Sequence, residues 1–358
     1  MIKRTGFLQK LNRMLSVFPV TAILGPRQCG KTTIAKEIKA DHFFDLENPR
    51  DAAKFFEPQL FLESLSGMIV IDEVQRMPEL FPLLRYRVDN RTDQKYLLLG
   101  SASRKLISQG SESLAGRIGF LELNGFSLSE IRKNDWQKLW VRGGFPRAYL
   151  ADSNEDGALW RENYITTFLE QDIPQLGINI PATTLRRFWM MLAHYHGQVL
   201  NYSELGRSFG ISDVTARKYI DILTGTFMVR LLQPWFSNSS KRQVKSPKVY
   251  LRDSGVFHSL IGIDSFDELS ANPKIGASWE GFALEQIAGI LEKGNSQLFF
   301  WGTHGGAEVD LFFISNGKNY GVEFKYTSTP KISKSMRSAI EDLNLDHLWI
   351  VVPNTISF

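Results

Sequence analysis

Residues 25–32 of the 358-residue chain have the types and the spacing of a phosphate-binding loop. They are Gly-Pro-Arg-Gln-Cys-Gly-Lys-Thr and match the pattern GxxxxGK(S/T), between the strand-like segment VTAIL and the helix-like segment TTIAKEIKA. Such a loop turns backbone N–H groups toward phosphate oxygens, while Lys31 reaches the outer phosphates and Thr32 offers its hydroxyl to Mg²⁺. We therefore predict an ATP site with Mg²⁺, whose contacts come from Gly25, Pro26, Arg27, Gln28, Cys29, Gly30, Lys31, Thr32 and Thr33.

Three polar residues follow two other strand-like segments and are candidates for the chemistry of ATP hydrolysis. The apolar run 68–71 ends in Asp72 and Glu73, and the run 96–99 leads to Ser101. We predict that Asp72 holds Mg²⁺ through water and that Glu73 polarises the water that attacks the γ-phosphate. Ser101 is our candidate for orienting that water. A surface acid and a loop-capping serine are the alternative interpretations of Glu73 and Ser101.

A second group of carboxylates lies near the C-terminus. Asp310 is in the strand-like segment AEVDLFF, and Glu323 and Lys325 form an ExK pattern in GVEFK, thirteen residues after Asp310. On adjacent strands, two such carboxylates can share a metal ion that activates water, which Lys325 would position or deprotonate. The pattern predicts metal-dependent cleavage. Because exposed strand faces carry the same residue types, a structural role stays open.

A basic segment separates these two groups. Between residues 207 and 248, eight lysines and arginines face two aspartates, although the net charge of the chain is only +4. The segment YSELGRSFGIS followed by VTARKYIDIL has the spacing of a helix-turn-helix. The predicted phosphate contacts are Arg217, Lys218, Lys241, Arg242, Lys245 and Lys248. A solvated basic face, or a helix pair used for protein packing, would give the same pattern.

The elements that must position these residues alternate in type. Strand-like and helical segments alternate over the first 125 residues, which predicts a parallel sheet with helices on both faces. Residues 126–196 are mostly helical in pattern, and the segment from residue 278 onward has the order helix, strand, strand, helix, strand. A chain of 358 residues is longer than one hydrophobic core usually supports, so we expect several domains.

Composition excludes several classes of protein. The chain is 43% hydrophobic and 22% charged, which excludes disordered and collagen-like chains. No apolar run is long enough to span a bilayer, so we expect no membrane partner. Cys29 is the single cysteine, which excludes an intrachain disulfide and agrees with a reducing compartment. We expect a cytoplasmic protein.

Several motifs together resemble a known family. GPRQCGKTT, DLENP, IDEVQRMPELFPLLR, LLGSAS, LAGR and GGFP occur in this order. They resemble prokaryotic AAA-type ATPases whose C-terminal half is a domain of unassigned function related to PD-(D/E)XK nucleases. The resemblance implies that Arg117 enters a neighbouring subunit's site as an arginine finger in a homo-oligomer, for which a closed ring is the expected form. It also implies that Glu280 joins Asp310 and Glu323 as a metal ligand. A surface salt bridge is the alternative for Arg117.

The residue patterns together with this resemblance imply an α/β fold in four parts. They are a P-loop AAA-type ATPase core (1–125), a helical lid and linker (126–196), a winged helix (197–250) and a PD-(D/E)XK-nuclease-like domain (251–358). We expect an ATP-hydrolysing enzyme that acts on nucleic acid, most simply DNA, with a C-terminal domain that could cut it. The alternative is an ATP-operated switch whose nuclease-like fold is inactive and docks a protein partner.

Overall fold

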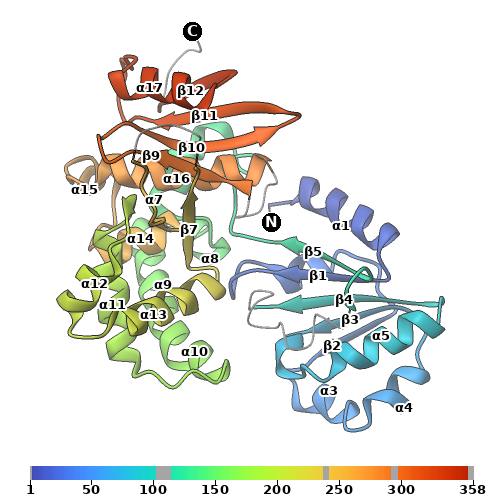
Figure 1. The fold of residues 1–358 in the computed structure, drawn as a ribbon. Helices are drawn as coiled ribbons and strands as arrows, with labels where there is room; N and C mark the ends of the chain where they lie inside the picture. The colour runs from blue at the N-terminus through green and yellow to red at the C-terminus, as the bar shows by residue number, and fades with distance from the viewer. Residues whose placement is uncertain (1, 102–113, 237–241, 292–296, 354–358) are drawn as a thin grey trace. The chain divides into compact units, whose positions relative to one another are not determined.

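The computed structural model describes residues 2–101, 114–236, 242–291 and 297–353 (Figure 1). The chain divides into two compact units. One consists of Met1–Phe126 with Gly225–Phe227, and the other of Ser127–Thr224 with Met228–Phe358. No helix in the described part of the chain is long and apolar enough to cross a membrane.

The first unit is built on a parallel five-stranded sheet with the strand order β2-β3-β4-β1-β5. The strands are β1 (Val20–Leu24), β2 (His42–Asp45), β3 (Gly67–Asp72), β4 (Gln94–Gly100) and β5 (Ile118–Glu122). Every residue of β1 is buried, as expected for a central strand covered on both faces. The predicted parallel sheet is therefore confirmed.

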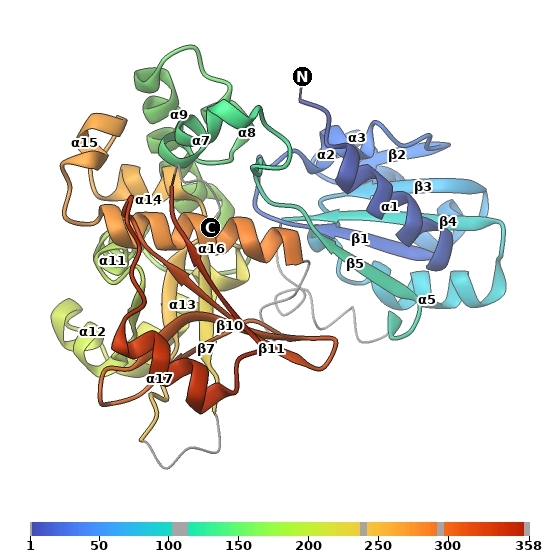
Figure 2. The ribbon, with the colours of Figure 1, turned by 90° about the horizontal axis from the view of Figure 1, so that it is seen from above.

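Among the described residues, one helix precedes these strands and four connect them. The first is α1 (Thr5–Val17), and the connecting helices are α2 (Lys31–Ala35), α3 (Pro49–Lys54), α4 (Pro58–Glu63) and α5 (Leu80–Asn90), with a 3-10 turn at Val74–Arg76. Figures 1 and 2 both show α1 running alongside β1. Leu11 and Leu15 form the buried side of α1, which agrees with the amphipathic pattern of this segment.

The second unit begins with helices. They are α7 (Trp136–Arg142), α8 (Pro146–Tyr149), α9 (Asn154–Thr167), α10 (Ile173–Gln175), α11 (Ala182–His194), α12 (Tyr202–Phe209) and α13 (Asp213–Gly225). A 3-10 turn at Lys133–Asp135 precedes α7, and a π-helical turn at Phe168–Asp172 joins α9 to α10. Further along the chain lie α14 (Ser254–Leu260), α15 (Phe266–Ser270), α16 (Ile275–Leu291) and α17 (Lys334–Leu343).

A mixed sheet of seven strands forms the other part of this unit, in the order β12-β11-β10-β9-β7-β8-β6. The strands are β6 (Gln198–Val199), β7 (Val229–Pro234), β8 (Lys248–Leu251), β9 (Phe299–Gly302), β10 (Glu308–Ser315), β11 (Lys318–Phe324) and β12 (His347–Val351). Strand β7 pairs with β9 through Gln233 and Phe299. The predicted boundary at residue 250 therefore falls within one continuous sheet.

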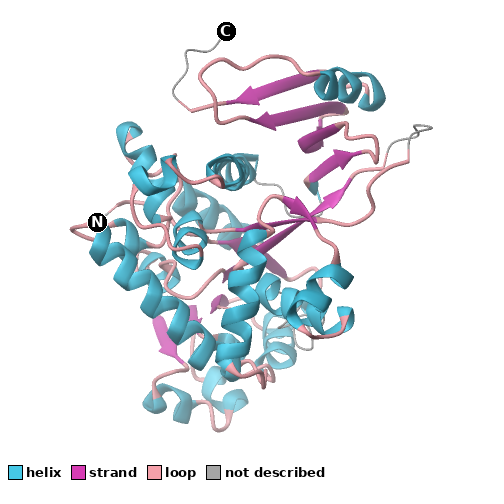
Figure 3. Cartoon of the chain, turned by 90° about the vertical axis from the view of Figure 1, so that its left-hand side faces the viewer, coloured by secondary structure: helices cyan, strands magenta, loops and turns pink. Residues whose placement is uncertain are grey.

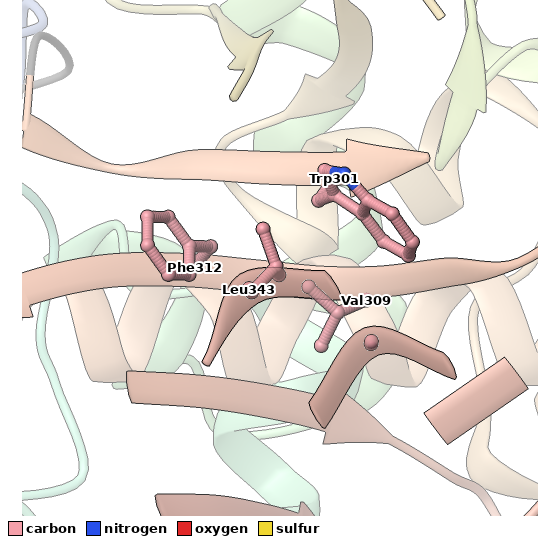
Figure 4. Packing of buried hydrophobic residues seen from close by; sticks show 5 residues of the cluster. Trp301, Val309, Phe312 and Leu343 are labelled. Carbon is pink, nitrogen blue, oxygen red and sulfur yellow. The ribbon is translucent and has the colours of Figure 1, made fainter. Parts of the chain in front are cut away.

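A small hydrophobic core fixes α17 against the C-terminal strands (Figure 4). Its buried side chains are Trp301 from β9, Val309 and Phe312 from β10, and Ala339 and Leu343 from α17. The pairing of β10 with β9 shifts register between Val309 and Phe312. Because successive side chains of a strand point to opposite faces, a core position for Val309 turns the neighbouring Asp310 toward the other face. Both units combine helices with sheet, which confirms the α/β class (Figure 3).

Candidate active site

The predicted phosphate-binding loop connects β1 to α2, at the carboxyl edge of the sheet in the first unit. The carboxyl ends of the neighbouring strands β4 and β3 lie at the same edge, because all three strands are parallel. A Cβ atom on Gly25 would lie 1.9 Å from the backbone oxygen of Leu123. Glycine at this position is therefore required for the loop to pack against the chain that follows β5.

Lys31 is held within the loop by neutral groups. Its side chain is 5% exposed, and its Nζ donates hydrogen bonds to the backbone oxygens of Gly25 (3.0 Å) and Pro26 (2.9 Å). Carbonyl oxygens carry no net charge, so they leave the charge of the ammonium group uncompensated. Lys31 is thus positioned to exchange these two acceptors for anionic phosphate oxygens.

Thr32, in α2, and Asp72, at the end of β3, are the two residues that the sequence analysis assigns to Mg²⁺, and their side chains are in direct contact. The Thr32 hydroxyl donates a hydrogen bond to Asp72 Oδ2 at 2.7 Å, and Asp72 Oδ1 accepts the Glu73 backbone N–H at 2.9 Å. Burial raises the pKa of the Asp72 carboxyl, although the hydrogen bond from Thr32 opposes this. A hydroxyl beside a carboxylate is an oxygen donor set that suits Mg²⁺. These two residues therefore fit the metal that a P-loop implies.

Glu73 and Ser101 also lie together, and a third residue joins them. The backbone of Glu73 has a left-handed φ of 56° and leads into the turn Val74–Arg76. Within this turn, Gln75 Nε2 contacts Glu73 Oε2 and donates a hydrogen bond to Ser101 Oγ at 2.9 Å. The Ser101 hydroxyl lies 3.4 Å from Glu73 Oε2. Gln75 was missed by the sequence analysis, because its place depends on the left-handed turn at Glu73.

The C-terminal carboxylates gather around a lysine from β8. The Nζ of Lys248 donates to Glu280 Oε1 (3.1 Å) and Asp310 Oδ1 (3.2 Å), and it also contacts Glu308. Glu323 in β11 pairs with Lys325, with 2.8 Å between Oε2 and Nζ. The acids that the sequence singled out are therefore brought to one region, and Lys248 lies among them. We call Glu280, Glu308, Asp310, Glu323, Lys248 and Lys325 the carboxylate cluster.

Comparison with known proteins agrees with the P-loop geometry. The model of an AAA domain matches residues 17–132, and two models of domains of unknown function match residues 133–267 and 275–358. The uncharacterized protein Rv2008c of Mycobacterium tuberculosis is 49% identical over 362 residues, which cover 100% of this chain and 82% of the relative. The uncharacterized protein Mb2031c of Mycobacterium bovis gives the same values. The chain belongs to this family of AAA-type ATPases.

A solved structure supports the same fold. The Walker-type ATPase paby2304 of Pyrococcus abyssi superposes with a TM-score of 0.50 and 14% sequence identity, and the match covers 73% of this chain and 96% of that one. At this identity the likeness concerns the fold alone. The two chains therefore share a fold over most of their lengths.

The remaining loop residues of the ATPase differ in their surroundings. Pro26 and Cys29 are buried, whereas Gln28 and Thr33 are exposed. The Arg27 guanidinium donates a hydrogen bond to Glu47 at 2.5 Å. The thiol of Cys29 donates to the Leu123 oxygen at 3.2 Å, and burial raises its pKa. The predicted nucleotide contacts thus comprise the loop 25–30 and the first turn of α2.

Arg117 forms an ion pair in the ATPase chain. Its Nε and Nη2 donate to the two carboxylate oxygens of Asp89, at 2.5 and 2.9 Å. The side chains are 33% and 40% exposed, so the pair lies at the surface. Within one chain, Arg117 therefore forms a surface salt bridge, which is the alternative that the sequence left open.

The basic segment of the ATPase is only partly a surface feature. Helices α12 and α13 are joined by a turn at Gly210, and a Cβ atom on Gly206 would lie 2.7 Å from the oxygen of Ile211. Arg217 lies over the Tyr202 ring at 3.8 Å from its centroid. The exposed cations are Arg207, Arg217, Lys218, Arg242 and Lys245. Lys241 lies outside the described residues.

Two predictions about the second unit need correction. Lys248 does not contact solvent as a phosphate-binding residue would, because it is 3% exposed and paired with carboxylates of the cluster. Within the described part of the ATPase, no group of three or more His, Cys, Asp or Glu side chains could hold a metal ion. The predicted metal ligands Glu280, Asp310 and Glu323 therefore do not form a metal site as they stand.

The electrostatics of the cluster reflect its burial. Burial raises the pKa of Glu280 to about 7, with a contribution from the negative charge of Asp310 and an opposing one from Lys248. Burial, assisted by Asp310, likewise raises the pKa of Glu323 to about 7. Burial would lower the pKa of the Lys248 ammonium, but the neighbouring Tyr250 hydroxyl and the carboxylates around it, led by Glu280, outweigh it and raise that pKa well above its ordinary value.

Proposed function

We propose that this AAA-type ATPase hydrolyses ATP at the P-loop and uses the energy to act on nucleic acid. The observation that carries the hydrolysis step is the meeting of Lys31, the Thr32–Asp72 pair and the Glu73–Gln75–Ser101 group at the carboxyl ends of three adjacent strands. In this proposal, ATP binding and activation of the attacking water are carried out by different residues at the same edge of the sheet.

Each group has a separate task in this proposal. Lys31 exchanges the carbonyl oxygens of Gly25 and Pro26 for the outer phosphates. Thr32 and Asp72 would hold Mg²⁺, which when bound neutralises charge on the β- and γ-phosphates. Glu73 accepts a proton from the attacking water. The amide of Gln75 contacts the Glu73 carboxylate and fixes its direction, which makes Gln75 a positioning residue.

Action on nucleic acid is proposed for the helix pair α12–α13. We infer that residues 197–250 work as a winged helix, with β7 and β8 as the wing strands. The proposal is supported by the tight turn between the two helices and by four exposed cations on α13 and before β8. These are Arg217, Lys218, Arg242 and Lys245. Lys241 remains in the proposed footprint, and Lys248 is removed from it.

The salt dependence of DNA binding tests this footprint. The binding constant K falls as salt rises, so a plot of log K against log salt has a negative slope. Each lost duplex phosphate contact makes this slope shallower by about 0.9, and the double variant Arg217→Ala, Lys218→Ala should make it shallower by roughly 1.8. Lys334→Ala, an exposed lysine on α17, is the matched control and should leave the slope unchanged. We also expect duplex DNA to raise the steady-state rate at which the parent chain releases phosphate from ATP. An unchanged slope in the double variant would remove these residues from the footprint.

We also propose a homo-oligomer in which Arg117 reaches a neighbouring active site. For this, its ion pair with Asp89 must open when subunits meet. Mixing Arg117→Ala with Glu73→Gln should then restore part of the ATPase rate, because some interfaces combine an intact arginine with an intact glutamate. No recovery on mixing, together with monomers in sedimentation with ATP, would contradict this arrangement.

A second candidate function concerns the C-terminal domain, which we propose has a PD-(D/E)XK-like fold. Such a fold either cuts nucleic acid with a metal or serves as a docking scaffold for another protein. The position of Lys248 among the carboxylates favours the scaffold. Incubation of the full chain with duplex, single-stranded and branched DNA in Mg²⁺ or Mn²⁺ tests this directly. Metal-dependent cleavage that is lost in Asp310→Ala would favour the nuclease instead.

A further inference from the structure

We propose that the ammonium group of Lys248 is the permanent cation of the carboxylate cluster and takes the place that a divalent metal would need. In this view the cluster of the native chain binds no metal. The inference concerns the second unit alone and does not depend on ATP hydrolysis.

The position of Lys248 carries this inference. Its side chain is 3% exposed, and it enters from β8, whereas its carboxylate partners come from α16 and β10. Glu280 and Asp310 bind the same Nζ atom at 3.1 and 3.2 Å, so the ammonium group joins the two elements. Glu308, at the start of β10, also contacts it. A metal shared by Glu280 and Asp310 would have to occupy this same space.

The carboxylates of Asp310, Glu280 and Glu323 each already have at least one oxygen bound to a partner within the fold. Asp310 Oδ1 accepts from Lys248, and Asp310 Oδ2 accepts the Phe324 backbone N–H at 3.0 Å. Glu280 Oε1 accepts from Lys248 and also from the Tyr250 hydroxyl, at 2.6 Å. Glu323 Oε2 pairs with Lys325. An incoming divalent cation would therefore have to displace hydrogen bonds and would meet the positive charge of Lys248 in a poorly solvated place.

Charge balance explains why a lysine is needed here. Asp310 and Glu323 are 5% and 3% exposed, and buried carboxylates are costly unless a cation or hydrogen-bond donors compensate them. In this chain, Lys248 supplies that compensation to Asp310 and to its neighbour Glu280, while Lys325 supplies it to Glu323. Removal of the Lys248 ammonium group leaves Glu280, Glu308 and Asp310 without their shared cation, and such a group of carboxylate oxygens is the donor set that hard divalent cations prefer.

The experiment measures Mn²⁺ binding by the full chain without nucleotide. Thr32→Ala is present in every arm, so that the ATP site contributes no metal. Lys248→Ala should gain one Mn²⁺ per chain, seen as loss of the free Mn²⁺ signal in electron paramagnetic resonance, and Mn²⁺ should raise its Tm. The parent and Lys334→Ala, which removes an exposed lysine of α17, should show neither effect. Adding Asp310→Asn to Lys248→Ala should abolish the gain.

Two results would overturn the inference. One is a parent chain that binds one Mn²⁺ which Asp310→Asn removes, because the cluster would then accept a metal beside Lys248. The other is a folded Lys248→Ala chain that gains no Mn²⁺. If Lys248→Ala does not fold, Lys248→Met keeps the length of the side chain and takes its place. If neither Lys248 variant folds, Mn²⁺ binding by the parent is still compared with Mn²⁺ binding by Asp310→Asn, and a metal in the cluster of the native chain would appear as a difference between them.

Discussion

Lys31 in the first unit and Lys248 in the second are both almost fully buried, at 5% and 3% exposed, but their partners differ in charge. Lys31 donates to two neutral carbonyl oxygens of its own loop. Lys248 binds carboxylates from two other elements. A lysine on neutral acceptors keeps its charge available for a phosphate, whereas a lysine among carboxylates already compensates them. Burial of a lysine therefore does not indicate its role until its acceptors are known.

The largest expected effect is on the affinity for nucleotide, and it distinguishes Lys31 from Lys248. Lys31→Ala should weaken binding of an ATP analogue by roughly 100-fold or more, because it removes charge-assisted bonds to phosphate. Lys248→Ala should leave the dissociation constant of the analogue unchanged. Calorimetry with a non-hydrolysable analogue measures both. Equal losses in the two variants would contradict the distinct roles assigned to them.

Another buried ion pair, around Glu285, extends the comparison to stability. Glu285 is flanked by Arg230 and Arg252, with 3.2 Å between Glu285 Oε2 and Arg252 Nε. Burial would raise the pKa of Glu285, but the two arginines outweigh it and lower the pKa to about 2. Glu285→Gln should lower the free energy of unfolding at pH 7 by about 3 kcal/mol.

The pH dependence of that difference follows from the sign of the shift. The folded-state pKa lies below the ordinary glutamate value, so the stabilisation is complete above pH 4.5 and is lost as pH falls toward 2. The gap in unfolding free energy between parent and Glu285→Gln should therefore narrow over this window in denaturant titrations. A gap that stays constant down to pH 2 would show that Glu285 is not stabilised by its charge.

A smaller effect is expected at Gln75. Because Gln75 contacts Glu73 and Ser101 without belonging to the loop, Gln75→Ala should lower kcat about tenfold and leave KM nearly unchanged. Gln75→Glu should not restore the rate, since it places a second negative charge beside Glu73. Steady-state phosphate release measures both constants. A rise in KM with kcat preserved would move Gln75 from positioning to nucleotide binding.

Local sequence patterns predicted much of the first unit. The loop at residues 25–32, the apolar run before Asp72 and the run before Ser101 each carry their own signal, because a strand followed by a phosphate loop and a helix is specified within about twenty residues. The parallel order of the sheet then brings the three ends together. Gln75 could not be predicted, because it reaches Ser101 only after the left-handed turn at Glu73.

The second unit was less predictable because its site depends on distant pairing. Lys248 follows a run of exposed cations, so the sequence favoured a surface role for it. Only the pairing of β8 with β7 and β6 turns Lys248 inward, toward residues more than thirty positions away. The same pairing continues through β9 and joins the proposed winged helix to the C-terminal strands in one sheet. Charge patterns along a chain therefore do not reveal which cation becomes buried.

The most direct test of the account is single-turnover hydrolysis of bound ATP by Glu73→Gln. The parent chain should convert bound ATP to ADP and phosphate, and Glu73→Gln should bind ATP equally well but hydrolyse it at least about 100-fold more slowly, because it lacks the base that polarises water. Glu79→Gln, which changes an exposed acid further along the same segment of the chain, should hydrolyse at the parental rate. A Glu73→Gln chain that releases phosphate as fast as the parent would contradict the assignment of the active site.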